Sequence, residues 1–596
     1  MRILLAFIML ITAVLFSAEA AASKGKGYVR LVREDDVWWF ENSEGEKFFS
    51  LGVNCVGGCF GHYEESPLNE ARKSWIVSQL SEMKFNTAGA WSSPSVWGDF
   101  YFADQIYTSF VEYLNDVFDV SFWTGFEQHL SKEVKPFAGN KNFIGYFLDN
   151  ERAWDPCKVL QFYLHLSKDA PGSRALLEFL KDLYGEKIES LNKSWNSSFE
   201  SFEDIPGSKA PNSDRSLLEK LFKPWRNKVA AQYYKQYCHI LRKLDPNHLI
   251  LGIRYKGIPD LSLFGALAPY FDANSINDYN RYGHLDSLYS KFYRISGKPL
   301  MITEFSFSGY PQQGQKSLLF IDIYSQRNRG IGYNKYVRSA ARTSFMVGMH
   351  WFMWMDYEKH WEYPPDINVG LVSNDGTKSY NELARQIKKT NKNVNAAHQS
   401  PVTAENQEEP SELRLLSRFT PSIDGDLSEW SEGHKFLPQE VICLLETNAI
   451  KHTYYLSWDD NFLYLGGDIS DSHLDYPGRD FVWQADYLSI YLGPIAEQQN
   501  DKIKHTLFYI YPTGGGIRGK EPYVNEWRES GGYQPVRSKV SKRSKAGGYA
   551  IEAAIPLKIG TNLSVTSGTE CKLQLIYQDV SGIYRTILRN KIIFRP

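Results

Sequence analysis

The sequence predicts a (β/α)8 barrel followed by a C-terminal antiparallel β-sandwich, and three observations lead to this prediction. From residue 28 to residue 392, apolar runs of strand length alternate with stretches of helical periodicity, as in a parallel sheet. Residues 393–413 are polar, contain two prolines and lack apolar periodicity, which is typical of a linker. Residues 414–596 carry short alternating strands between turns rich in Gly, Asp and Asn, which favours a sandwich. A chain of 596 residues is also too long for one compact core.

Eight apolar runs are predicted as the barrel strands, because eight strand–helix units fit a closed barrel better than an open doubly wound sheet. These runs cover residues 48–56, 85–91, 106–113, 143–151, 248–255, 271–279, 299–305 and 349–356, of which the third is the weakest. Between the first two, Ile76, Leu80 and Met83 share one helical face, and a further helix begins near Val120. No glycine-rich phosphate loop opens any helix, which argues against a nucleotide-binding sheet.

A helical insertion follows the fourth strand. Its first part has a stripe of leucines and a glycine, Gly185, where a helix would end. Its second part ends at Asp245-Pro246. The predicted sandwich strands are residues 452–460, 462–470, 486–493, 505–512 and 549–557.

The N-terminal segment is predicted to be a signal peptide covering residues 1–22. It has one arginine, a long apolar stretch and then Ala18-Glu19-Ala20, which fits a signal-peptidase site. A membrane anchor is the alternative, and the small residues after the apolar stretch favour cleavage. No later stretch is apolar for long enough to span a bilayer. We therefore expect a secreted or periplasmic protein with no membrane association after cleavage.

Charge and cysteine content exclude other partners. The formal net charge is −2, with acids and bases interspersed, so there is no basic patch for nucleic acid. Six cysteines are too sparse for a disulfide scaffold and lack paired zinc-ligand spacing. Cys55 and Cys59 could pair in an oxidising compartment, but buried thiols are the simpler expectation. The thirteen histidines show no grouping with carboxylates, so a metal-dependent hydrolase is disfavoured and no cofactor is expected.

Polar and aromatic residues follow the predicted strands, at the end of a barrel where chemistry takes place. Two of them are glutamates: Glu151 after the fourth strand and Glu304 in the seventh. The other strand ends present Asn54, Trp91, Asn150, Arg254, Asp278, Tyr279, Trp351 and Trp354. We expect these side chains to surround one mouth. Those predicted to bind the substrate are Asn54, Trp91, Asn150, Arg254, Tyr279, Trp351 and Trp354.

A pair of carboxyl groups is what glycosidic cleavage requires. One protonated acid donates to the leaving oxygen while the other, ionised, attacks the anomeric carbon. Neighbouring carboxyls also push their pKa values apart, which separates the two roles. Each glutamate has a structural alternative, as a helix N-terminal residue for Glu151 and as a bonded structural carboxylate for Glu304. Asp149 is another acid, but in a regular strand it points away from its neighbours.

At these residues the sequence resembles the clan A glycoside hydrolases, whose pattern is an Asn-Glu acid/base on strand four and a Glu nucleophile on strand seven. The segments "FNTAGAWS", "IGYFLDNE", "DPNHLILGIRY", "PLMITEFSF" and "NVGLVSNDG" resemble β-agarases and β-galactosidase-type members. The resemblance implies that Asn150 binds the sugar 2-hydroxyl and that Tyr279 hydrogen-bonds the nucleophile. It assigns no role to Arg254, because the commoner arginine of the clan is on strand two. Trp351 and Trp354 are predicted to stack on sugar, with core packing as the alternative for one of them.

The C-terminal region has a signature of its own. The segments "IDGDLSEW", "LSWDDNFLYLGGDISD", "WQADYLSIYLG" and "YAIEAAIP" resemble family 9 carbohydrate-binding modules. Trp458 and Trp483 are the candidates for stacking on sugar rings, whereas Trp430 is expected in the core. A spacer without sugar binding is the alternative. The acidic turn at residues 468–471 is a candidate for a structural calcium ion, although such turns are mostly only turns.

The sequence therefore predicts an exported retaining glycoside hydrolase that cleaves β-linked galactose-containing polysaccharides or oligosaccharides. Two alternatives stay open. One is a non-catalytic carbohydrate-binding protein on a barrel scaffold, and the presence of both glutamates argues against it. The other is a β-glucanase or β-mannanase with the same two-glutamate mechanism.

Overall fold

The computed structural model separates the chain into two compact units, one with the predicted barrel and one with the predicted sandwich. Up to residue 401 it describes residues 27–58, 68–106, 114–208, 215–279, 289–309, 325–356, 368–373 and 375–401. Further along it describes residues 413–436, 440–443, 452–470, 487–493, 506–511, 523–528, 532–535, 539–545, 548–557, 570–578 and 584–594. The predicted signal peptide, residues 1–22, lies outside these ranges.

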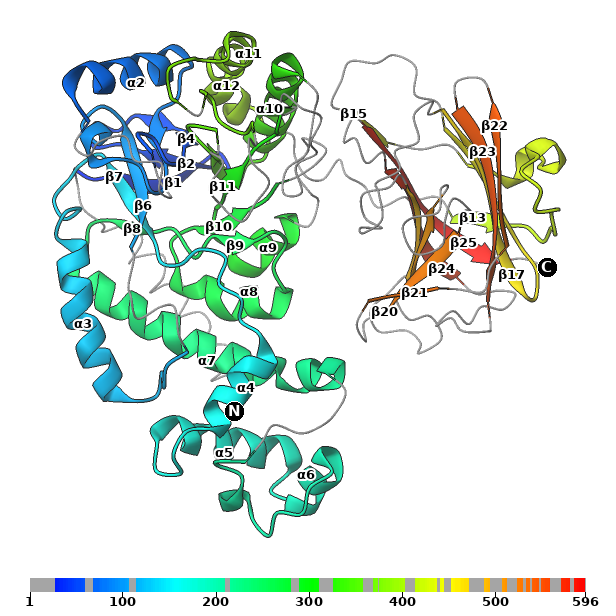
Figure 1. The fold of residues 1–596 in the computed structure, drawn as a ribbon, viewed down its shortest axis with the longest axis horizontal. Coiled ribbons are helices and arrows are strands. Elements are labelled where there is room, and N and C mark those ends of the chain that lie inside the picture. The colour runs from blue at the N-terminus through cyan, green and yellow to red at the C-terminus, as the bar shows by residue number, and fades with distance from the viewer. Residues whose placement is uncertain are drawn as a thin grey trace. The chain divides into compact units, whose positions relative to one another are not determined.

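The first unit contains a parallel nine-stranded sheet in the order β8-β7-β6-β5-β4-β12-β11-β10-β9 (Figure 1). Its strands are β4 Ser50–Val53, β5 Thr87–Ala88, β6 Tyr101–Gln105, β7 Phe143–Phe147, β8 Leu249–Ile250, β9 Tyr255–Lys256, β10 Asn274–Asn277, β11 Leu300–Phe305 and β12 Met346–Trp351. The two outer strands of this order, β8 and β9, are separated in the chain only by residues 251–254. That short segment joins the two edges, so the predicted (β/α)8 barrel is confirmed.

The fifth barrel strand differs from its prediction. The run at residues 248–255 was expected to be continuous, but β8 pairs with β7 and β9 pairs with β10. Gly252, with φ 93°, and Arg254, with φ 51°, interrupt it because neither has the extended backbone of a strand. The interruption lies where Arg254 enters the barrel mouth.

The third barrel strand was predicted in the wrong place. The strand is β6, Tyr101–Gln105, and residues 107–113 of the predicted run lie outside the described residues. The misplacement has a physical cause: β6 is short and ends in Asp104 and Gln105, so it lacks the apolar run by which the other strands were recognised.

Several of the described α-helices before residue 401 begin at a side chain that caps the first turn. Asn69 caps the first of them by accepting from the backbone N–H of Arg72 at 2.9 Å, and Asp155 caps α4 in the same way. The helices are α2 Glu70–Glu82, α3 Val120–Val134, α4 Pro156–Leu164, α5 Pro171–Tyr184, α6 Ile188–Trp195, α7 Arg215–Leu244, α8 Leu261–Leu267, α9 Tyr289–Ser296, α10 Gln326–Ala341, α11 Asn381–Asn391 and α12 Val394–Gln399. Short 3-10 turns lie at Pro94–Val96, Phe202–Asp204 and Ala268–Tyr270.

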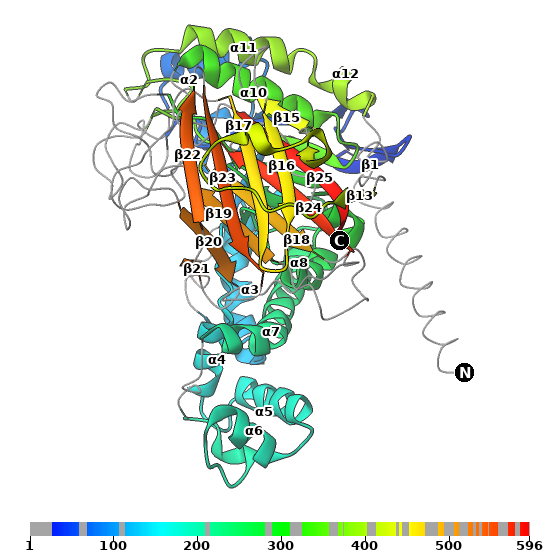
Figure 2. The same ribbon diagram turned by 90° about the vertical axis from the view of Figure 1, so that its right-hand side faces the viewer.

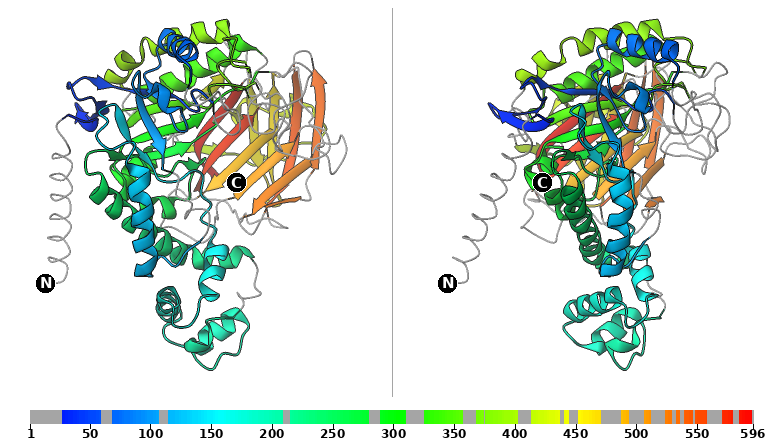
Figure 3. Two further views of the ribbon diagram at one scale, coloured as in Figure 1. Left: turned by 60° about the vertical axis from the view of Figure 1, so that its left-hand side comes forward. Right: turned by 90° about the vertical axis from the view of Figure 1, so that its left-hand side faces the viewer.

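The insertion between β7 and β8 consists of α4 to α7. Gly185 ends α5 with φ 63°, as its position in the sequence predicted, and α7 ends at Leu244 before Asp245-Pro246. Helices α5 and α6 form a protrusion away from the barrel sheet, whereas α7 runs back along the barrel (Figures 1 and 3). Helix α7 contacts the segment after β7, because Tyr234 of α7 donates to Asp149 Oδ2 at 2.6 Å.

Two features of this unit were not predicted. A three-stranded antiparallel sheet of β1 Arg30–Glu34, β2 Val37–Glu41 and β3 Lys47–Phe48 precedes the barrel. Its Phe40 shares a buried cluster with Ile144 and Met301, so it covers the N-terminal end of the barrel. In addition, residues 394–399 of the predicted linker form α12. His398 of this helix is buried and its ring nitrogens bond to Ala341 O at 2.6 Å and Trp38 O at 2.7 Å.

The second unit contains two sheets, as predicted for a sandwich (Figure 2). One has eight strands, with β13-β25-β24-β18-β19-β20-β21 in order and β15 paired to β25; the other is β14-β16-β17-β23-β22. The strands are β13 Leu413–Leu416, β14 Lys435–Phe436, β15 Glu440–Cys443, β16 Thr453–Trp458, β17 Phe462–Ile469, β18 Tyr487–Gly493, β19 Thr506–Tyr511, β20 Tyr523–Arg528, β21 Gly532–Pro535, β22 Lys539–Lys545, β23 Gly548–Pro556, β24 Glu570–Gln578 and β25 Tyr584–Phe594. Alternate residues such as Leu488, Ile490 and Leu492 of β18 enter its core.

The cysteine expectation is corrected at one position. Cys55 is in a disulfide, not a thiol as expected, while Cys59 lies outside the described residues. Cys238 is a buried thiol, in agreement with the expectation. Over the described ranges, no helix has the length and apolar character needed to cross a membrane.

Candidate active site

Glu304 lies near the C-terminal end of β11 and is only 5% exposed. Arg254 Nη2 donates to its Oε1 at 2.5 Å, and the Tyr279 hydroxyl donates to its Oε2 at 2.6 Å. Burial raises the pKa of Glu304, and the charge of Glu151 adds to the rise, whereas Arg254 and Tyr279 oppose it. The two donors therefore favour the ionised carboxylate in surroundings that disfavour charge. The contact implied for Tyr279 by the family resemblance is present.

Glu151 follows β7 in a different setting. Its backbone is left-handed, with φ 51°, and its N–H donates to Arg254 O at 3.1 Å. Its Oε1 accepts from Asn277 Nδ2 at 3.1 Å, and Lys256 Nζ lies 3.6 Å from its Oε2. The Glu151 side chain is 25% exposed. It therefore keeps access to water and to a ligand in the mouth.

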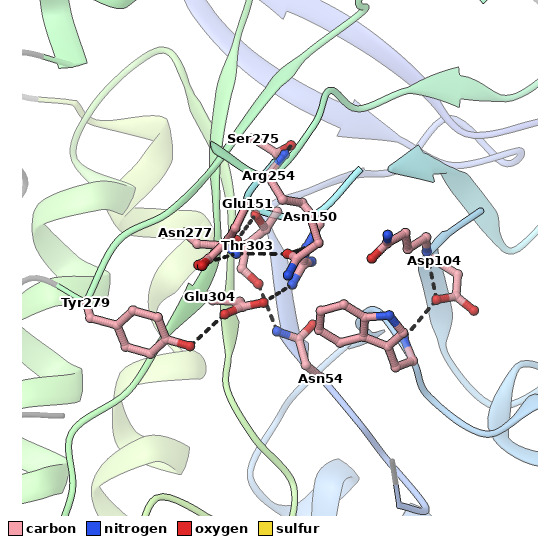
Figure 4. Close-up of polar contacts among 12 residues, drawn as sticks. Asn54, Asp104, Asn150, Glu151, Arg254, Ser275, Asn277, Tyr279, Thr303 and Glu304 are labelled. Atoms are coloured by element: carbon pink, nitrogen blue, oxygen red, sulfur yellow. Dashed lines mark hydrogen bonds and ion pairs between the residues drawn. The ribbon is translucent and has the colours of Figure 1, made fainter. Parts of the chain in front are cut away.

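Three polar side chains join the two glutamates (Figure 4). Asn150 Oδ1 accepts from Arg254 Nε at 2.9 Å and from Asn277 Nδ2 at 3.0 Å. The same Asn277 amide reaches Glu151, and the same guanidinium reaches Glu304. Because Asn150 Oδ1 is occupied twice, its Nδ2 is the group that remains for a ligand hydroxyl.

Arg254 is held from several sides, which explains how a buried cation is tolerated. Its guanidinium lies 4.6 Å from the centre of the Trp91 ring and 5.0 Å from that of Phe147. Its left-handed backbone donates from N–H to Ser275 Oγ at 2.9 Å. The position of Trp91 is set in turn by Asp104, whose Oδ1 accepts from the Trp91 backbone N–H at 2.8 Å.

Sequence reasoning missed two residues of this network. Asn277, the link between Asn150 and Glu151, was placed inside the sixth strand, and the next residues, Asp278 and Tyr279, were taken as its end. Its Oδ1 accepts from Thr303 at 2.9 Å, one residue before Glu304. Asp104 was missed because the third strand was misplaced. Burial raises the pKa of Asp104 to about 6.

The tryptophans of the eighth strand do not have the predicted role. Trp351 and Trp354 are fully buried. The Trp351 indole donates to Val369 O at 3.0 Å, and Trp354 packs edge-on against Trp75 with 5.9 Å between ring centres. The prediction that both stack on sugar is therefore corrected: the described contacts place both rings in the core, because the sequence does not show which face of a buried strand a ring occupies.

Asn54 is also buried rather than exposed in the mouth. Its Nδ2 donates to Thr303 O at 2.8 Å, so it supports the backbone next to Glu304. The expected substrate contact is replaced by this supporting one. Trp91, by contrast, is only partly buried and lies beside Arg254, within the predicted mouth.

In the sandwich, the two candidate tryptophans have different outcomes. Trp458 is buried and donates to Leu416 O at 3.0 Å, so it belongs to the core and the predicted stacking on sugar is corrected. Trp483 lies outside the described residues. Trp430 is buried as expected and donates to Glu552 Oε1 at 2.7 Å, which joins the "IDGDLSEW" and "YAIEAAIP" segments.

No metal site is evident in the parts of the chain that the structure describes, since they contain no group of three or more His, Cys, Asp or Glu side chains suited to an ion. Of the acidic turn predicted as a calcium candidate, Asp471 lies outside those parts. The calcium prediction stays a prediction.

Comparisons with known proteins agree with both units. A family model described as "Carbohydrate family 9 binding domain-like" matches residues 423–589. Beta-agarase B of Vibrio sp. (strain JT0107) is 28% identical over 385 residues, which are 59% of this chain and 39% of that protein. Endo-1,4-beta-xylanase A of Thermotoga maritima is 28% identical over 162 residues, covering 25% of this chain and 14% of the xylanase.

Solved structures share the fold. The crystal structure of an agarase superposes with a TM-score of 0.53 at 19% identity, covering 63% of this chain and 66% of that chain. An exo-β-agarase gives a TM-score of 0.53 at 20% identity, with the same coverage. The chain thus resembles β-agarases, and its C-terminal region resembles family 9 carbohydrate-binding modules, as the sequence motifs indicated. It spans 39% of the length of the Vibrio relative.

Proposed function

We propose that this chain is a retaining glycoside hydrolase that cleaves β-linked, galactose-containing polysaccharides or oligosaccharides of the agar type. The observation that carries the proposal is the pair of glutamates, Glu151 after β7 and Glu304 in β11, joined by Asn277, Asn150 and Arg254. Two carboxyl groups at one barrel mouth, one buried and bonded to a cation and one open to water, suit a two-step displacement.

In the first step, Glu304 attacks the anomeric carbon and Glu151 donates its proton to the glycosidic oxygen. The bond to the leaving sugar breaks, and a glycosyl ester forms on Glu304. In the second step, Glu151 takes a proton from water, the water oxygen attacks the anomeric carbon, and the ester bond to Glu304 breaks. Arg254 and Tyr279 stabilise the carboxylate as it leaves, because both already donate to its oxygens at 2.5 and 2.6 Å.

Asn150 is assigned to the 2-hydroxyl of the sugar that reacts. Its Oδ1 is fixed by two donors, so its Nδ2 already has one direction before the substrate binds. Binding therefore loses little conformational entropy of this side chain. A hydrogen bond to this hydroxyl that strengthens as the ring approaches an oxocarbenium ion lowers the barrier.

A neutral substrate is supported by the state of Arg254. This cation is buried and engaged with Glu304 and Asn150, so it is not presented to a sulfate group. The resemblance to Beta-agarase B supports a galactan, and the match of residues 423–589 supports sugar binding by the sandwich. The proposal includes export directed by residues 1–22 to a secreted or periplasmic location, where a polysaccharide substrate would be met.

The test compares agarose oligosaccharides with cello- and manno-oligosaccharides of equal length, and follows the anomeric configuration of the first product by NMR. We expect preference for the agarose series and retention of configuration. Preference for either other series would overturn the galactan assignment, and inversion would overturn the mechanism. Binding of sugars without turnover would instead favour a carbohydrate-binding protein.

A further inference from the structure

A buried ion pair brackets the proposed acid/base in the sequence. Asp149 and Arg152 lie on either side of Asn150 and Glu151, and Arg152 Nη1 is 3.6 Å from Asp149 Oδ2. Their side chains are only 5% and 13% exposed, respectively. The mechanism does not use either group, although burying two charges is costly unless they are well paired. This cost calls for a reason.

The ion pair is built into helix α7 of the insertion. Tyr234 of α7 donates its hydroxyl to Asp149 Oδ2 at 2.6 Å. The Arg152 guanidinium contacts two aromatic rings, 4.6 Å from the centre of Trp154 and 4.9 Å from that of Tyr233. Burial raises the pKa of Asp149, and Arg152 and Tyr234 oppose that rise. These contacts join the chain around Glu151 to a long helix at several points.

The segment needs such support because of its backbone. Glu151 has φ 51°, a left-handed conformation that costs energy for a residue with a side chain and persists only when its surroundings enforce it. One anchor is the hydrogen bond from the Glu151 N–H to Arg254 O at 3.1 Å. The second anchor is the ion pair between Asp149 and Arg152, which precede and follow Glu151 in the chain.

We propose that Asp149, Arg152 and Tyr234 are positioning residues that hold the left-handed turn at Glu151, so that its carboxyl meets the glycosidic oxygen. The inference rests on the proposed function, and it gives the inserted helix α7 a part in catalysis. It also accounts for the consecutive polar residues after β7, which are Asp149, Asn150, Glu151 and Arg152.

The test uses the dependence of the rate on the leaving group. In the glycosylation step, proton donation matters for a poor leaving group and little for an activated aryl glycoside, so misplacing Glu151 should slow glycosylation only with the first kind of substrate. Tyr234→Phe and Arg152→Met should therefore lower kcat on unactivated oligosaccharides by about ten- to hundredfold, since ~1 Å of misplacement can cost that much. Glycosylation by an activated aryl galactoside should change by less than about threefold.

Tyr146→Phe is the matched control. Tyr146 of β7 donates to Asp245 Oδ2 at 2.6 Å, beside the start of β8, so this variant also removes one hydroxyl and one buried bond to an aspartate. We expect it to lower the melting temperature as much as Tyr234→Phe does. It should change the rates on both kinds of substrate by the same factor.

The outcomes separate the two proposals. A selective loss on unactivated substrates in Tyr234→Phe, absent in the control, supports the positioning role. Equal losses in the glycosylation rate on both kinds of substrate, or no loss, would overturn it while the proposed function stands. If Arg152→Met does not fold, Tyr234→Phe decides, because it removes a single oxygen. A wild-type protein that turns over neither substrate would overturn the proposed function and this inference together.

Discussion

The two glutamates of the barrel mouth are held in opposite ways. Glu304 sits within β11, in register with Asn277 of β10, is 5% exposed and receives bonds from a cation and a phenol. Glu151 follows its strand in a left-handed turn, is 25% exposed and receives one bond from an amide. The difference suits the two tasks. A nucleophile needs a fixed charge and a fixed position, whereas an acid/base must exchange protons with water.

The largest loss of activity is expected at Glu304, which is buried and held by two donors; we call this the rigid side of the site. Glu304→Ala should lower kcat on every substrate by at least about 10⁴-fold, because no other group can form the glycosyl ester. Circular dichroism should show an intact fold. Residual activity that is equal on activated and unactivated substrates, and well above this limit, would remove Glu304 from the nucleophile role.

At Glu151, the open side of the site, the loss of activity should depend on the substrate. Glu151→Ala should lower turnover of unactivated oligosaccharides by about 10²–10⁴-fold, because general acid catalysis is lost. With an activated aryl galactoside the first step should survive, and added azide should restore turnover by replacing the water that Glu151 activates. Equal loss on both substrates without azide rescue would contradict the assignment.

Tyr279→Phe probes how the rigid side controls charge. Glu304 acts when ionised, so activity falls as the pH drops through its pKa, which burial has raised. The Tyr279 hydroxyl opposes this rise, and its removal should move the acid limb of kcat/KM to higher pH, by roughly one pH unit for the loss of a hydrogen bond to a charged group. Tyr336→Phe removes a hydroxyl bonded to Asp278 at 2.9 Å and should leave the limb in place. A shift in the opposite direction would contradict the account.

The sequence was sufficient to predict both glutamates of the site. An apolar run followed by an acid marks Glu304 and Glu151, since parallel strands of a barrel read as apolar runs and present their polar residues at one end. The same reasoning failed for β6, whose five residues include Asp104 and Gln105. A strand that contributes polar groups to the mouth loses the apolar pattern that would reveal it.

Other residues were misjudged because a strand pattern does not give side-chain direction. Trp351 and Trp354 were expected in the mouth but lie in the core. Asn277 lies in β10, as expected, but its contact with Glu151 was not predicted. The role of Arg254 depends on the break at Gly252 and Arg254, where two left-handed residues turn the chain. A single sequence places Arg254 in a strand and cannot show this turn.

Asn277→Ala tests the link between the two sides. Asn277 Nδ2 bonds both Asn150 and Glu151, so its loss should lower kcat by about tenfold, as for one or two hydrogen bonds. Asn277→Asp should be worse, since a carboxylate accepts from Thr303 but cannot donate to Asn150 or Glu151 and adds a like charge. An Asp variant that is more active than the Ala variant would mean that the donated bonds do not matter.

The smallest effect is expected at Lys256, which forms an ion pair with Glu151. Its Nζ is 3.6 Å from Glu151 Oε2, but its side chain is 80% exposed, so water and salt screen the pair. Lys256→Met should change kcat by less than about twofold at low salt, and the difference should vanish at ~1 M salt. Lys243→Met, which breaks an exposed pair with Glu127 on α3, is the control for loss of a surface charge. A tenfold loss of kcat specific to Lys256→Met would show that a charge holds Glu151, as Arg254 holds Glu304. The two glutamates would then differ less than the structure indicates.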